Sequence, residues 1–369
     1  MKYNTAGKRI DWIDICKFLA ITIMCLGHIG VPANISDLLH IFHMPVFFLL
    51  SGICFKAEKY TDFPMFLKAR CKTLLIPHLF WSITMYIVWR MYCKFSMLGR
   101  PVSFPSFLWM ILTKDASDVQ FGGFGVIQWF FTSLFFAELL FYSVLTISQK
   151  CKHKKEMIFL LCLCLALAGF FVSKLTSYNP LGIVASFMGV LFYGVGFIWK
   201  NYYYNGFDKK INNMRAIFQD IGILIVLFII VLFVWKYNGS TNMRTSSYNN
   251  FMLFVLGAIA GSYILIYVSH YIEKISQNRQ MFLYRYMLYI GQNTLIILVF
   301  NRLVQFTIVN TINSILNIFI SGEMAVTLIW KVCLVLLDLS IEMVAFVPII
   351  WLINRYLPLT VGRKKHTNL

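Results

Sequence analysis

Acidic residues are scarce in this sequence, and charge of any kind is limited. The 369 residues include 15 Asp and Glu against 33 Lys and Arg, and 13% are charged while 59% are hydrophobic. A typical soluble domain has about 25% charged and about 45–50% apolar residues, so this balance excludes an ordinary water-soluble fold. The sequence also lacks any polar stretch long enough to bury a core of its own, which excludes an attached soluble domain.

Metal-ligand and redox motifs are missing as well. The nine cysteines form no CxxC pair, and most lie in apolar stretches, so we interpret them as small buried hydrophobic residues. The net charge of +18 does not indicate nucleic acid, because the basic residues occupy short loops between apolar runs. We therefore expect no disulfides and no nucleic-acid partner.

Apolar runs of about 20 residues, the length that crosses a bilayer, recur along the whole chain. They predict an all-α, polytopic membrane protein with the lipid bilayer as its partner, formed by a single membrane-embedded domain over residues 1–369. The bundle should contain about ten transmembrane helices. The predicted spans are residues 12–31, 38–55, 73–93, 126–147, 157–173, 180–199, 219–236, 250–270, 283–301 and 325–354.

Basic residues divide unequally between the two sides of this map. Of the 33 Lys and Arg, 23 fall on the termini and the even-numbered loops, and 7 fall on the other loops. Cytoplasmic loops of membrane proteins carry an excess of Lys and Arg. Both termini are therefore predicted to be cytoplasmic, in a multi-pass protein of the cell (plasma) membrane.

The first predicted helix holds two polar residues that are costly in lipid. Lys17 lies near its cytoplasmic end and His28 near its outer end, 11 residues or about 16 Å apart. Since a charge in the hydrocarbon region costs at least about 2.5–3.5 kcal/mol, both are candidates for function. Lys17 could instead reach the inner headgroups with Asp14 as its partner. His28 could instead be an interfacial histidine that bonds the backbone.

Two further histidines, His40 and His43, open the second predicted helix after a short loop without Lys or Arg. Three imidazoles should thus converge near the outer face. A histidine, with a pKa near ~6.5, can take a proton from an attacking hydroxyl at neutral pH. Zinc is the other interpretation, but no acidic or cysteine ligand stands at suitable spacing, so no metal is expected.

Charged residues elsewhere also suggest sites. The loop before the third predicted helix, on the cytoplasmic side, contains Lys68, Arg70 and Lys72. Their charges either reflect only the usual excess of basic residues in cytoplasmic loops or bind an anionic ligand. Glu138, inside the fourth predicted helix, is a further intramembrane acid and so a candidate for function.

The tenth predicted helix carries Asp338 and Glu342 at i,i+4, with Lys331 on roughly the same face. We expect a structural salt bridge inside the bundle. The alternative is a proton relay.

Several segments resemble a known family. The segments are RIDWIDICKFLAITIMCLGH, HIFHMPVFFLLSGICF, FLKARCKTLLIPHLFW, IQWFFTSLFFAELLF and IGQNTLIILVFN. They are similar to the membrane-bound acyltransferase-3 family, which includes fucose-4-O-acetylase-like proteins and polysaccharide O-acetyltransferases. That family has a basic residue, ten intervening residues and a histidine in its first helix, which Lys17 and His28 match. Its members often have arginine in place of Lys17, and many have histidine in place of Asn301.

The resemblance implies an O-acyltransferase that moves an acetyl (acyl) group from cytosolic acetyl-CoA to a hydroxyl. The acceptor would be a surface or exported glycan or a small hydroxylated molecule, and association with polysaccharide-synthesis machinery is a further expectation. His28 would act as base or acyl carrier, with Lys17 as its basic partner. The candidates for the acceptor side are His40, His43 and Glu138. The CoA phosphates would face Lys68, Arg70 and Lys72.

Two alternatives remain open from the sequence. A ten-helix bundle with buried acids and histidines could export a glycan or act as a proton-coupled transporter, although no pair of inverted repeats with matching broken helices is evident. A non-catalytic membrane subunit that partners a polysaccharide synthase is the third interpretation.

Overall fold

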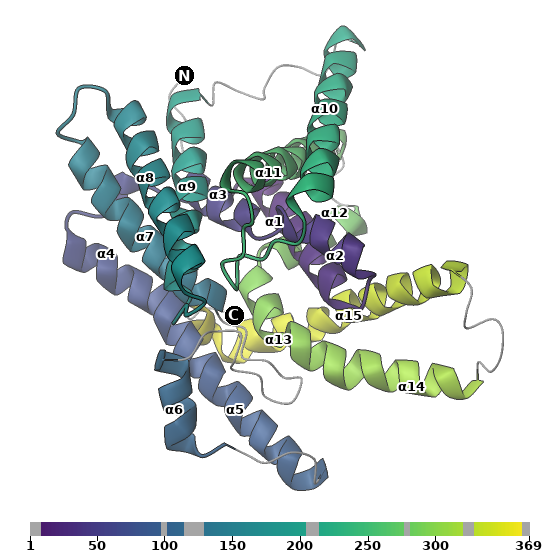
Figure 1. Cartoon of the computed structure of the whole chain (residues 1–369). Coiled ribbons are helices and arrows are strands. Elements are labelled where there is room, and N and C mark those ends of the chain that lie inside the picture. The colour runs from purple at the N-terminus through teal and green to yellow at the C-terminus, as the bar shows by residue number, and fades with distance from the viewer. Residues whose placement is uncertain are drawn as a thin grey trace.

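Helices form almost all of the regular structure in the described residues. The computed structural model describes residues 9–96, 102–113, 129–203, 214–276, 281–319 and 328–363, and an isolated bridge joins Asn242 to Ser247. The longer helices (Figure 1) are α1 (Asp11–His28), α2 (Ala33–His40), α3 (Pro45–Cys54), α4 (Phe63–Arg70), α5 (Ile76–Ser96), α6 (Phe104–Thr113), α7 (Trp129–Ser148), α8 (Lys154–Leu175), α9 (Ile183–Ile198), α10 (Met214–Asn238), α11 (Phe251–Ile275), α12 (Phe282–Gly291), α13 (Thr294–Val304), α14 (Asn310–Phe319) and α15 (Leu328–Tyr356).

Nine helical segments of the described chain are long and apolar enough to cross a membrane, which confirms the predicted all-α, multi-pass fold. They are Ala33–Cys54, Phe63–Phe95, Trp129–Ser148, Lys154–Leu175, Ile183–Tyr203, Phe218–Asn238, Phe251–Ile275, Thr294–Ser314 and Trp330–Tyr356. The first predicted span corresponds to α1, which is not among the nine because Asp11, Asp14 and Lys17 lie within its 18 residues. Surrounding protein accommodates these charges: α1 lies in the middle of the bundle and contacts α2, α3, α11, α12, α13 and α15 (Figure 1).

Two predicted spans are interrupted in the structure. The second begins earlier than predicted, at Ala33, and a turn separates α2 from α3, which starts at Pro45, a residue that suits a first helical turn. The ninth is split between α12 and α13. Asn293 sits at that break, where its side-chain amide donates to the Tyr289 carbonyl at 2.6 Å and so competes with the helical hydrogen bonds.

Glycines allow α3 and α9 to pack with their backbones in close approach. A Cβ on Gly52 would lie 1.9 Å from the Tyr193 carbonyl oxygen, and one on Gly196 would lie 2.1 Å from the Leu49 carbonyl oxygen. Both distances are far below a van der Waals contact, so only glycine fits at either position. Small residues let membrane helices associate in this way, because lipid supplies no hydrophobic force to bring helices together.

The start of α1 and the end of the described chain lie at the same end of the bundle. The backbone at Gly291 packs against the Asp14 carbonyl of α1. Next to it, the Gln292 carbonyl accepts a hydrogen bond of 2.6 Å from the Arg363 guanidinium. This arrangement fits an even number of crossings, with α1 as one of them.

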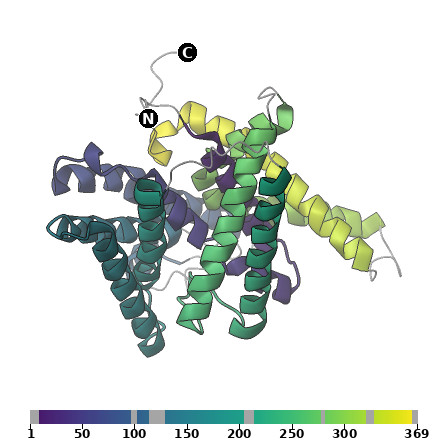
Figure 2. The same cartoon turned by 90° about the horizontal axis from the view of Figure 1, so that it is seen from above.

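We call this the lysine end, because two lysines lie there. Lys17 is one helical turn from Asp14, and Lys72 is next to Thr73, which packs against Gly362 near the end of the described chain. The opposite end, where α1 finishes at His28, is the histidine end. Both views show α15, in yellow, projecting from one side of the bundle (Figure 2).

Candidate active site

A polar cavity of about 180 Å³ lies at the histidine end. Residues from α1, the α2–α3 turn, α7, α13 and the loop between α10 and α11 surround it, so segments far apart in the sequence meet there. The lining residues are Met24, His28, His40, His43, Met44, Trp129, Asn242, Met243, Arg244, Leu298, Val299, Asn301 and Arg302. We call it the histidine cavity.

Three histidines converge on this cavity, as the sequence predicted. The ring centroids of His28 and His40 are 6.2 Å apart, and those of His40 and His43 are 4.8 Å apart. The Nδ1 atom of His40 lies 2.6 Å from the Ser36 carbonyl oxygen, and that of His43 lies 2.8 Å from the Leu39 carbonyl oxygen. Because a carbonyl only accepts, both Nδ1 atoms carry the hydrogen, which leaves each Nε2 as a hydrogen-bond acceptor.

His28 differs from the other two because its ring makes no hydrogen bond with any described residue. The half-buried side chain also lines a second cavity, of about 300 Å³, on its other side. This second cavity is lined by His28, Ile29, Gly30, Arg302, Gln305, Phe306, Val309, Asn310, Asn313 and Asp338. His28 is therefore available to a ligand, whereas His40 and His43 are fixed by their own helical turns.

The loop of residues 239–250 covers part of the histidine cavity and contributes Asn242, Met243 and Arg244. Figure 1 shows this loop crossing the middle of the bundle between α10 and α11. Asn179 holds it in place, since its side-chain amide donates to the Arg244 carbonyl at 3.2 Å and to the Ser246 hydroxyl at 3.1 Å. The carbonyl of the same side chain accepts from the Val184 backbone at 2.8 Å, which fastens the loop to the first turn of α9.

Two acids of α15 are bound by amides at the cavities: Asp338 lines the second cavity, and Glu342 lies next to the histidine cavity, where it contacts Asn301. Asn301 donates to Glu342 Oε1 at 2.8 Å, and Gln305 donates to Oε2 at 3.3 Å. Asn313 donates to Asp338 Oδ2 at 3.1 Å. The predicted salt bridge with Lys331 is wrong for the described residues, because neutral amides take the place of a cation and Lys331 is exposed.

Lys17 remains at the lysine end and is not brought to His28. Its ammonium lies 3.6 Å from Asp14 Oδ1, which confirms Asp14 as its partner. The side chain is half-buried, and Asp14 is buried. The length of α1 separates Lys17 from His28 by about 16 Å, so any joint role must act through a substrate that spans the gap.

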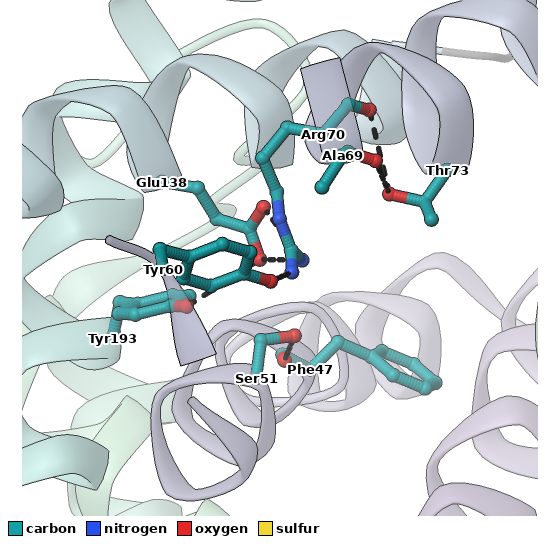
Figure 3. Close-up of polar contacts among 8 residues, drawn as sticks. All are labelled: Phe47, Ser51, Tyr60, Ala69, Arg70, Thr73, Glu138 and Tyr193. Carbon is teal, nitrogen blue, oxygen red and sulfur yellow. Dashed lines mark hydrogen bonds and ion pairs between the residues drawn. The ribbon is translucent and has the colours of Figure 1, made fainter. Parts of the chain in front are cut away.

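Glu138 is not at the histidine cavity, which corrects the prediction that grouped it with His40 and His43. It pairs with Arg70, whose Nη1 atom lies 3.2 Å from both carboxylate oxygens, while Nη2 donates to the Tyr60 hydroxyl (Figure 3). The Tyr193 hydroxyl donates to Glu138 at 3.4 Å. The sequence could not show this pairing because the two charged residues are 68 positions apart.

The three basic residues predicted to meet CoA phosphates are thus in different environments. Arg70 is engaged inside the bundle by Glu138 and Tyr60, whereas Lys68 and Lys72 are exposed. The two lysines remain accessible to a ligand at the lysine end.

Two arginines of the histidine cavity, Arg244 and Arg302, were not singled out from the sequence. They belong to the seven basic residues on the predicted outer side. Because these residues run against the charge bias, topology does not account for them, and this was the signal that could have identified the two arginines. Asn301, noted only as a departure from a family pattern, proves to be part of the cavity wall. In the described chain, no cluster of three or more His, Cys, Asp or Glu could hold a metal ion.

The fold and this cavity define a multi-pass membrane protein with a histidine-lined site between its helices. A family model described as an acyltransferase domain, that of the acyltransferase-3 family, matches residues 10–354. The chain belongs to the acyltransferase-3 family. Membership implies acyltransferase activity and suggests an acyl-CoA donor. Searches of curated proteins and of solved structures found no match.

Proposed function

We propose that this protein is a membrane O-acetyltransferase that moves an acetyl group from cytosolic acetyl-CoA to a hydroxyl of a surface or exported glycan. The observation that carries the proposal is His28, a histidine without a hydrogen-bond partner among the described residues, in a polar cavity of an acyltransferase-3 protein. His40 and His43 add two ring nitrogens that can accept hydrogen bonds from sugar hydroxyls.

In the proposed reaction, His28 accepts the proton of the acceptor hydroxyl while its oxygen attacks the thioester carbonyl of acetyl-CoA. The carbon–sulfur bond then breaks, and the CoA thiolate leaves with the proton from His28. In a two-step route, a ring nitrogen of His28 attacks the thioester carbonyl, the carbon–sulfur bond breaks and CoA leaves as its thiol with the ring proton. The acceptor oxygen then attacks the acetyl-histidine, the carbon–nitrogen bond breaks, and the hydroxyl proton passes to the imidazole. Both routes require the ring of His28 to be accessible, as it is in this cavity.

We assign the lysine end to the donor and to the cytoplasm, with both termini on that side of the plasma membrane. Lys68 and Lys72 would meet the CoA phosphates, and Lys17 would supply positive charge along the path as the basic partner of His28. Arg70 is given a structural role instead, because Glu138 and Tyr60 already engage it. The charge bias of the loops supports this direction.

A route between the two ends must pass apolar side chains. A cavity of about 10 Å³ adjoins the histidine cavity and shares Met44 and Leu298 with it. Phe47 and Phe130 line it as well. This space is no larger than one water molecule, so we expect these side chains to move when the thioester arm of the donor enters.

Replacing His28 tests the proposal. We expect His28→Ala to lower transfer of labelled acetyl from acetyl-CoA into alkali-labile esters by at least about 10²–10⁴-fold, the usual contribution of a general base. The assay uses membranes that contain the full chain, and gel filtration in detergent checks folding. His153→Ala is the matched control, because His153 is exposed before α8 and away from the cavity.

The outcomes separate the proposal from its alternatives. Retained ester formation in a folded His28→Ala protein would exclude His28 as base or carrier. Movement of a glycan across the membrane without any ester label would instead support the predicted exporter or transporter.

A further inference from the structure

A groove of about 1210 Å³ lies between α1, α12 and α15, and it shares no lining residue with the two cavities at the histidine end. Pockets for small molecules usually measure about 300–1,000 Å³, so this space is larger than most of them. The groove is lined by Phe18, Thr22, Phe282, Leu283, Arg285, Tyr286, Tyr289, Leu339, Ser340, Met343, Val344, Val347, Pro348 and Trp351. We call it the α15 groove.

The α15 groove opens to the side of the bundle. Figure 2 shows α15 projecting from the other helices, and the groove residues Val344 and Trp351 are 66% and 50% exposed. Both belong to Trp330–Tyr356, a segment apolar and long enough to cross a membrane. Because the hydrocarbon region holds no water, the medium that covers the open side of the groove is lipid.

The polar groups inside the groove are already engaged by the protein. Each of the four hydroxyl groups that line it donates to a backbone carbonyl: Thr22 to Phe18 at 2.8 Å, Ser340 to Leu336 at 2.7 Å, Tyr286 to Met343 at 3.0 Å and Tyr289 to Val347 at 3.3 Å. The remaining lining residues are apolar, apart from Arg285. The groove is therefore suited to a hydrocarbon chain and not to a sugar or a nucleotide.

The length of the groove matches one leaflet of a bilayer. Its lining residues on α15 run from Leu339 to Trp351, a rise of about 18 Å at about 1.5 Å per residue. Half of a hydrocarbon core of about 30 Å is about 15 Å. Trp351 lies toward the lysine end, because Asn354 in the following turn donates to Asn293 at 2.9 Å and accepts from Arg363 at 2.6 Å. The groove thus fits a fatty-acyl chain of the leaflet at the lysine end.

Two exposed arginines flank the groove at the lysine end. Arg285 lines it directly and follows Tyr284, whose hydroxyl donates to Asp11 at the start of α1 at 2.8 Å. The guanidinium of Arg355 lies 5.4 Å from the ring centroid of Trp351, which also lines the groove. None of the lining residues is Asp or Glu. An anionic group is the complement to this end of the groove.

A second copy of the chain fits this surface less well than a lipid does. In a two-fold dimer the same surface faces itself, so Arg285 and Arg355 of both copies would be brought together with no acid among the lining residues to separate them. A lipid supplies the chain and the negative charge in one molecule.

We propose that the α15 groove binds an anionic phospholipid, with an acyl chain between α1, α12 and α15 and the phosphate at Arg285 and Arg355. The bound lipid would join α15 to α1, the helix that carries Lys17 and His28. This inference goes beyond the proposed function and does not depend on it.

The test measures which lipid the protein retains. Purified full-length protein is equilibrated in dodecyl maltoside with equal amounts of phosphatidylglycerol and phosphatidylcholine that carry the same chains. After gel filtration, mass spectrometry measures each lipid per protein. We expect phosphatidylglycerol to be retained in preference. Arg285→Gln and Arg355→Gln should each lower this preference by about fivefold, the contribution of one basic residue beside an anionic lipid.

Matched variants show whether the lipid lies in this groove. Val344→Trp places a large side chain in the groove and should lower retention of both lipids, whereas Val332→Trp, exposed on the same helix but outside the groove, should not. Arg285→Lys keeps the positive charge and should keep most of the preference. Lys150→Gln removes an exposed cation outside the groove and should leave the preference unchanged.

Several results would overturn the inference. Equal retention of the two lipids would do so, and so would a preference that survives both arginine replacements. Unchanged retention in folded Val344→Trp protein would mean that the lipid lies elsewhere. A dimer that Val344→Trp disrupts would instead show a second copy of the chain in the groove. None of these measurements requires ester formation, so the His28→Ala experiment tests the proposed function separately.

Discussion

Two polar clusters lie inside this bundle, and they differ in how their charges are satisfied. In the first, Arg70 and Glu138 bind each other and the hydroxyls of Tyr60 and Tyr193 contact the pair, while the buried Nε atom of Arg70 has no hydrogen-bond partner among the described residues (Figure 3). In the second, the histidine cavity, the His28 ring has no hydrogen-bond partner among the described residues. We call the first cluster closed, because the described chain engages its carboxylate, and the second open, because the His28 ring remains available to a ligand.

The comparison shows that a buried ionisable residue is not by itself evidence of a site. Charged residues inside a membrane protein are costly and so attract attention, yet a pair that satisfies itself can serve only to hold helices together. Arg70 and Glu138 join the end of α4 to α7, and Tyr193 adds α9. A functional site needs polar atoms that line a cavity and remain available to a ligand. Only the three-dimensional structure shows which atoms these are.

The largest loss of stability that we expect comes from removing one partner of the ion pair in the closed cluster. Glu138→Ala leaves the half-buried Arg70 without its carboxylate, and loss of one partner of a buried pair typically destabilises a protein by about 3–5 kcal/mol. We expect a much lower thermal midpoint in detergent and poor recovery of folded protein. Arg70→Met combined with Glu138→Leu should recover much of the loss, because an apolar pair of similar volume needs no partner.

Glu156→Ala is the matched control for this experiment. Glu156 pairs with Lys155 at 3.5 Å on the surface, with both side chains well exposed, so its loss should change the thermal midpoint little. If the double replacement at 70 and 138 proved as unstable as Glu138→Ala, the unpaired arginine would not be the cause. We would then assign the cluster a role beyond joining helices.

Most helices could be predicted from the sequence because each apolar run is a local signal, and so could pairs within one helix, such as Lys17 with Asp14. The three histidines could be brought together because one short loop joins their helices. The partner of Glu138 could not be predicted. No local period encodes a contact between α7 and the last residue of α4, and helix packing decides it.

The loop of residues 239–250 forms a lid over part of the histidine cavity, and its position could not be predicted for the same reason. Residues 239–250 are a polar loop in the sequence, and contacts with Asn179, 65 positions before Arg244, help to hold this loop at the histidine cavity. Likewise, the break before α13 depends on side chains that bond Asn293 and Gln292 from distant segments, such as Asn354 and Arg363.

A smaller effect is expected when the lid of the open cluster is loosened. Asn179→Ala removes the bonds to the Arg244 carbonyl and the Ser246 hydroxyl, and leaves the buried Val184 N–H without its acceptor. We expect a loss of about 1–3 kcal/mol in unfolding free energy. The KM for the acceptor should rise, while the KM for acyl-CoA should stay nearly constant, and steady-state kinetics measures both.

Asn201→Ala is a suitable control, because the Asn201 side chain bonds only the Phe197 carbonyl of its own helix among the described residues. It should affect neither KM. An equal rise in both KM values for Asn179→Ala would indicate a general loosening of the bundle and not a lid over the acceptor site.

The smallest effect should follow from removing the exposed lysines, and it sharpens the comparison by asking whether the lysine end is also open to a ligand. Lys68→Ala and Lys72→Ala should each change the unfolding free energy by no more than about 0.5 kcal/mol, since both side chains are exposed. If they meet donor phosphates, the double variant should raise the KM for acetyl-CoA by up to about fivefold per lysine, the range for solvent-exposed ion pairs.

The same assay with a donor that lacks the 3′-phosphate shows whether the lysines contact the donor. If a lysine holds that phosphate, the rise in KM caused by the double variant should be smaller with this donor. Removing Lys150 and Lys152, also exposed, should leave the KM unchanged. An unchanged KM for Lys68→Ala/Lys72→Ala with both donors would mean that these lysines serve orientation in the membrane alone, and that the donor is held by groups inside the bundle.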